Sequence, residues 1–81
     1  MMQFEYNFLN EADDERKLFI EPWGEELVMK PKRHWQVAST HRLSDVAFHD
    51  EGTAIFFDSA SAILIKDMNT GEVVLEWQPA G

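Results

Sequence analysis

The chain has 81 residues, no cysteine and a net charge of −8, with fifteen Asp and Glu against seven Lys and Arg. This length allows a single domain, residues 1–81, and the absence of cysteine excludes a disulfide framework and suits a reducing compartment. The acidity repels phosphates and disfavours direct nucleic-acid binding, whereas it suits a protein partner with a basic surface. The first residues lack a signal-peptide pattern and no apolar run could cross a bilayer, so we expect a cytoplasmic protein without membrane contact.

Short apolar segments separated by turn residues follow one another along the chain and are typical of β-strands. In chain order the predicted strands cover residues 2–8, 18–20, 27–29, 35–39, 46–48, 54–57, 62–65 and 73–75. Residues 10–15 form a polar break, which we interpret as a loop with one short helical turn as the alternative. The turn after the fifth strand contains Gly52, which is expected to supply a positive φ.

Strands that recur about every ten residues, with no sustained helical periodicity, predict an all-β fold. The most compatible architecture is a compact sandwich that is antiparallel throughout, and a jelly roll or a small barrel of about eight strands is the alternative. The side chains predicted to form the core are Phe4, Tyr6, Phe8, Phe19, Val28, Trp35, Val37, Val46, Phe48, Phe56, Ile63, Ile65, Val73, Leu75 and Trp77.

The segment from residue 21 to residue 26 has the most distinctive composition. Pro22 and Gly24 define a turn, Trp23 supplies an aromatic ring, and Glu21, Glu25 and Glu26 supply three carboxylates. Two interpretations remain open, because Trp23 either folds back as a core plug or belongs to a rigid recognition loop. Glu25 and Glu26 are adjacent and would point to opposite faces, so they do not form a catalytic carboxylate pair.

The stretch L-F-I-E-P-W-G-E-E-L-V, residues 18–28, resembles a motif of small bacterial proteins of uncharacterised function. In that motif a strand leads into E-P-W-G-E-E and a proline-glycine turn follows a few residues later. This chain has Lys30-Pro31-Lys32-Arg33 at the place of the later turn. The resemblance implies a small β-domain and no particular activity.

The last three strands have apolar residues on both faces. If one face packs in the core, Ile55, Phe57, Leu64 and Val74 remain on the other face. Because consecutive strands are usually neighbours, these side chains are expected to form one contiguous patch. Two explanations are open: residues 10–17 fold over the patch, or it is an interface for a second copy or another protein.

Catalytic and metal-binding patterns are missing from the sequence. The three histidines, His34, His41 and His49, lack paired ligand spacing, so we predict no metal site. The serines lack a nucleophile-elbow context, and the four glycines are too far apart for a phosphate-binding loop. We therefore predict no catalytic residues and no cofactor.

These observations favour a non-enzymatic interaction domain, comparable with inhibitors, immunity proteins or antitoxins. It would use the acidic loop and the apolar sheet face to bind a basic partner or a second copy as a homodimer. The alternative is a domain that binds a small molecule or a carbohydrate, or a degenerate cupin-like jelly roll. In that case Trp23, Trp35 or Trp77 would form a stacking platform beside a cleft.

Overall fold

The computed structural model describes residues 2–79, which form eight strands. Their bounds are β1 (Phe4–Leu9), β2 (Arg16–Glu21), β3 (Glu25–Met29), β4 (His34–Ser39), β5 (Asp45–His49), β6 (Gly52–Phe56), β7 (Ile63–Asp67) and β8 (Val73–Trp77). All eight predicted strands are therefore present, and no helix occurs within the described range. Residues 10–15 form a loop, as the first of the two interpretations predicted.

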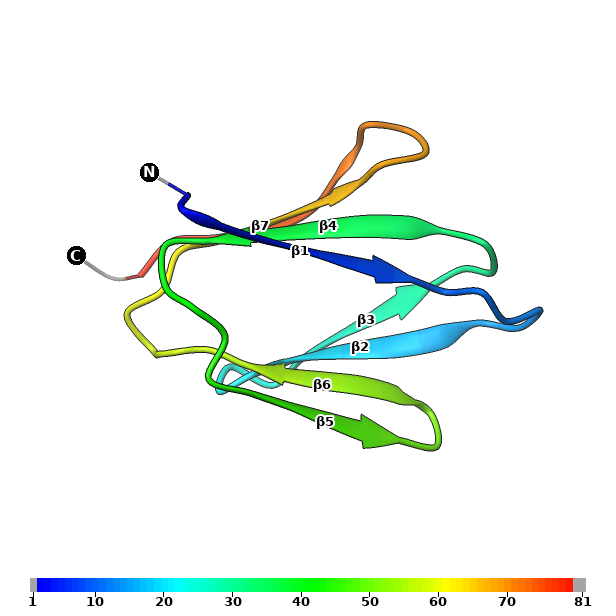
Figure 1. The fold of residues 1–81 in the computed structure, drawn as a ribbon, viewed down its shortest axis with the longest axis horizontal. Helices are drawn as coiled ribbons and strands as arrows, with labels where there is room; N and C mark the ends of the chain where they lie inside the picture. The colour runs from blue at the N-terminus through cyan, green and yellow to red at the C-terminus, as the bar shows by residue number, and fades with distance from the viewer. Residues whose placement is uncertain (1, 80–81) are drawn as a thin grey trace.

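The strands form two facing sheets, so the fold is a sandwich and not a closed barrel (Figure 1). One sheet has the order β1-β4-β7-β8 and the other has the order β3-β2-β6-β5. Tight turns connect β2 to β3, β5 to β6 and β7 to β8, while the other connections cross between the sheets. The β1–β2 loop and the β5–β6 turn lie at one end of the sandwich, and the β2–β3 turn lies at the other (Figure 1).

The prediction that the sandwich is antiparallel throughout is wrong at one pair, because β2 and β6 are parallel. The other five pairs are antiparallel. The parallel pair arises because β2 and β6 belong to different hairpins that meet at the centre of the same sheet. Gly52 lies opposite Lys17 in this pair and does not have a positive φ, so its expected role in the turn is also wrong.

The core lies between the sheets and contains four of the side chains predicted for it: Trp35, Val37, Ile63 and Ile65. Tyr6, Phe8, Leu75 and Trp77 are partly buried against this cluster, as period-2 alternation predicted for their strands. Phe4, also predicted to be core, is partly exposed, and the guanidinium of Arg42 lies 5.2 Å from the centre of its ring. The first sheet therefore faces the core largely as expected.

In the second sheet, the prediction selected the wrong face of three strands. Phe19, Val28 and Phe56 were expected in the core, but the core side chains of these strands are their neighbours in the sequence. The buried set is Leu18, Ile20, Met29, Ile55 and Phe57, with Leu27 partly buried against it. These strands carry apolar residues on both faces, so alternation alone does not say which face is covered.

Three further residues expected in the core are exposed. Val46 and Phe48 lie on the same side of β5 as the core, but β5 is an edge strand, and they are 37% and 82% exposed. Val73 pairs with Lys66 and is 56% exposed. The register between β7 and β8 shifts at Ile65/Lys66, and this irregularity brings both Val74 and Leu75 against the core.

Candidate functional site

The β2–β3 turn is anchored by its tryptophan. The ring of Trp23 lies 5.4 Å from that of Trp77 and 6.5 Å from that of Phe57, measured between centroids. Gly24 has φ of 73°, in the left-handed region where a side chain would be strained. Trp23 thus folds back against the core, as the first interpretation of this segment proposed.

The three carboxylates of this turn differ in their surroundings. Glu25 and Glu26 are exposed, whereas Glu21 is partly buried. Lys17 Nζ lies 2.7 Å from Glu26 Oε1 and 3.4 Å from Glu51 Oε2. The pKa of Lys17 is raised above its ordinary value, first by the hydrogen bond that its ammonium group donates to Glu26, then by the charge of Glu26, and then by Glu51. One carboxylate of the turn is therefore already paired within the protein.

The four residues of the expected apolar patch do not lie together. Ile55 and Phe57 are 0% and 5% exposed in the core, which overturns their placement on an uncovered face. Leu64 lies in the other sheet, between Ala38 and Glu76, and Val74 packs against the core. The reason is that the chain crosses from one sheet to the other between β6 and β7, so these strands are not neighbours.

A second acidic segment, which was expected only to be a polar loop, is held in place by a buried asparagine. Asn10 is 5% exposed and begins the β1–β2 loop. Its Nδ2 donates to the carbonyls of Asp14 (2.9 Å), Met29 (3.0 Å) and Lys30 (3.1 Å). Its Oδ1 accepts from the Ala12 N–H at 3.0 Å. One side chain thereby fixes the loop to the end of β3.

The loop presents its carboxylates to solvent. The side chain of Asp13 is 99% exposed and that of Asp14 is 72% exposed, and Glu11 and Glu15 are also exposed. Bonds from β2 place the acidic β5–β6 turn beside this loop: Arg16 Nη1 donates to the Asp50 carbonyl at 3.0 Å. We call residues Glu11, Asp13, Asp14, Glu15, Asp50 and Glu51 the acidic end. In the sequence, the acidic end could have been recognised only from the density of acidic residues. The conformation of its loop depends on hydrogen bonds from Asn10 to residues up to twenty positions away.

Asn10→Ala is expected to reduce the free energy of unfolding by about 2 kcal/mol, because three carbonyls lose their donor and two of these bonds reach β3 or the residue after it. Urea denaturation of both proteins measures this loss. Ala12→Ser changes the same loop without removing a side-chain hydrogen bond and is the matched control. A variant as stable as the wild type would show that Asn10 does not hold the loop.

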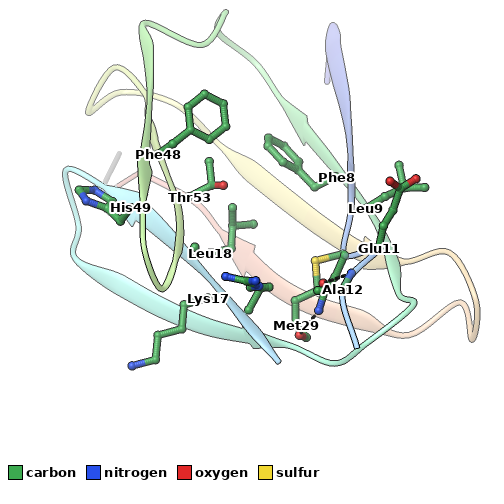
Figure 2. A pocket seen from close by; sticks show the side chains of 13 residues that line it. Phe8, Leu9, Glu11, Ala12, Lys17, Leu18, Met29, Phe48, His49 and Thr53 are labelled. Carbon is green, nitrogen blue, oxygen red and sulfur yellow. Dashed lines mark hydrogen bonds between the residues drawn. The ribbon is translucent and has the colours of Figure 1, made fainter. Parts of the chain in front are cut away.

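A groove of about 320 Å³ opens at the side of the sandwich where β1 and β5 are the edge strands. Figure 2 shows Phe8 of β1 and Phe48 of β5 at this groove, with Leu18 and Met29 from the second sheet. The β4–β5 connection covers the same side of the sandwich next to Tyr6 of β1. There the Leu43 N–H donates to the Tyr6 hydroxyl at 3.0 Å. The groove is thus open near Phe48 and next to the acidic end.

The three tryptophans pack in the core or against it. Trp35 is 5% exposed and Trp23 packs on Trp77, an arrangement that favours packing over a stacking platform. His34 Nε2 lies 2.8 Å from Asn7 Oδ1, whereas the His49 ring lies edge-on to Phe19. Within residues 2–79, no three His, Asp or Glu side chains are grouped so that they could hold a metal ion.

Comparison with known proteins gives no family model, no curated protein and no solved structure that matches this chain. Across residues 2–79 there is also no helix of the length and apolar character needed to cross a membrane.

Proposed function

We propose that this chain is a non-enzymatic interaction domain that binds a protein partner with a basic surface. The observation that carries the proposal is the acidic end, a set of exposed carboxylates on a loop that Asn10 fixes in one conformation. A charged surface that is already ordered loses little conformational entropy on binding, and its field speeds the encounter with an opposite charge. The cysteine-free sequence suits a cytoplasmic setting for this interaction.

Three of the six carboxylates of the acidic end have an ion pair within the described residues, namely Asp13, Asp14 and Glu51. Lys32 Nζ lies 3.4 Å from Asp13 Oδ1, and Arg16 Nε lies 3.5 Å from Asp14 Oδ1, but both pairs are exposed to solvent. Exposed pairs of this kind contribute about 0–1 kcal/mol and are easily exchanged for a new partner. Lysine and arginine side chains of a bound protein can therefore compete for the same carboxylates.

The test is capture of partners by the tagged protein from its native cells at low and high salt. The double variant Asp13→Lys/Glu15→Lys reverses two charges at the acidic end. Its control, Glu5→Lys/Glu76→Lys, makes the same change in net charge on the outer face of the first sheet, where both side chains are exposed. We expect basic proteins to be captured at low salt by the wild type and by the control, and to be lost from the loop variant.

Two results would contradict the proposal. One is equal loss of captured proteins with both double variants, which would show a general effect of net charge. The other is capture that does not weaken at high salt, since salt screens attraction between exposed charges.

A further inference from the structure

The edge strand β5 lacks the features that usually prevent an edge from pairing with another strand. It has no proline, no lysine and no register shift, and its only ionisable side chains are Asp45 at one end and His49 at the other. Two of the other edges carry more protection, because β3 starts with two glutamates and the β7–β8 pair is irregular. Charges and irregularities of this kind are common protection against edge pairing.

Two residues of β5 direct their backbone groups to the outer edge, and pairing with another strand would exchange the present side-chain acceptor of one of them for a backbone carbonyl. The Val46 N–H donates to Asp45 Oδ1 at 2.8 Å, a side chain of its own strand, and so does not serve the ladder to β6. Backbone groups alternate in direction along an antiparallel pair, so those of Phe48 point to the same outer edge. The side chains of Val46 and Phe48 are the exposed apolar residues of this strand, at 37% and 82%.

The strand is also complementary to itself. If two copies pair antiparallel about Ala47, Asp45 lies opposite His49 of the second copy, and Val46 lies opposite Phe48 of the second copy. Both Val46–Phe48 pairs fall on the core side and both Asp45–His49 pairs fall on the outer side, because alternate residues point to opposite faces. The outward backbone groups of residues 46 and 48 meet in this register.

We infer that β5 pairs antiparallel with β5 of a second copy, centred on Ala47, to join the two second sheets into one continuous eight-stranded sheet. The partner is thus a second copy of this chain, bound through a two-fold symmetric interface. This surface is distinct from the acidic end, so either proposal can fail while the other holds. The proposed self-association surface is thus the edge of β5. The surface expected from the sequence, formed by Ile55, Phe57, Leu64 and Val74, does not exist as one patch.

Sedimentation equilibrium of the wild type is expected to show a reversible monomer–dimer equilibrium. Phe48→Glu should raise the dimer dissociation constant at least about tenfold, because two symmetry-related Val46–Phe48 pairs are lost. The matched control Val73→Glu places the same charge at an exposed valine of β8 and should leave the constant unchanged. A wild type that is monomeric at roughly 1 mM, or an equal effect of the two variants, would overturn the proposal.

Cross-linking tests the register independently. The chain has no cysteine, so Ala47→Cys introduces a single thiol. Residues facing each other at the centre of this register have Cα atoms about 4.5 Å apart, within the range that a disulfide spans. Ala47→Cys should form a covalent dimer on mild oxidation much faster than the control Ala60→Cys, which lies in an exposed turn. Equal rates would rule out pairing centred on Ala47.

Discussion

Phe57→Glu is expected to unfold the domain at 25 °C. Phe57 is 5% exposed, belongs to the core and lies against Trp23. Loss of a buried phenylalanine side chain costs about 3–5 kcal/mol, and an unpaired buried carboxylate adds further desolvation cost. The sum is comparable with the whole stability of a small domain, about 5–15 kcal/mol. Circular dichroism and urea denaturation measure the effect.

The control for this prediction is Phe48→Glu, which makes the same chemical change at a residue that is 82% exposed. At a concentration where the protein is monomeric, it should keep the β-sheet spectrum and lose less than about 1 kcal/mol of stability. If Phe57→Glu folds with wild-type stability, Phe57 is not a core residue and the assignment of faces in the second sheet fails.

Gly52→Ala is expected to disrupt the centre of the second sheet. A Cβ atom at Gly52 would overlap the carbonyl oxygen of Lys17 and lie 2.6 Å from its carbonyl carbon and 2.8 Å from its nitrogen. These are backbone atoms of β2, which cannot move aside as the end of a flexible side chain can. The parallel β2–β6 pair must therefore separate locally, and we expect a loss of at least about 3 kcal/mol.

Gly71→Ala separates this steric effect from the general effect of replacing a glycine. Gly71 has φ of 81°, and nothing lies within 4 Å of an added Cβ, so the substitution should cost only about 1 kcal/mol through backbone strain. Thermal unfolding of the two variants compares them directly. Similar midpoints would mean that β2 and β6 do not approach as closely as the structure has them.

The positions of the strands could be predicted from sequence because turn residues and apolar runs are local signals. The inward faces of β1 and β4 followed from alternation, since Phe8 and Val37 have polar or smaller neighbours. The faces of β2 and β6 could not be derived in this way, because Phe19 and Phe56 are as apolar as the core residues beside them. Which face is covered depends on the sheet to which each strand belongs.

The acidic turn and the acidic end differ in how far the sequence revealed them. The composition of the β2–β3 turn indicated a rigid acidic segment, and the packing of Trp23 accounts for that rigidity. The β1–β2 loop was treated as an ordinary polar break, since the bonds of Asn10 to Met29 and Lys30 are long-range contacts. The edge position of β5, and with it the exposure of Phe48, follows from strand order, which no local pattern encodes.

The most direct test of the proposed function is calorimetric titration of a captured basic partner into this protein over a range of salt concentrations. We predict that the dissociation constant rises steeply with salt and is at least about tenfold higher for Asp13→Lys/Glu15→Lys than for Glu5→Lys/Glu76→Lys. An affinity that does not depend on salt, and that is the same for both double variants, would contradict binding through the acidic end.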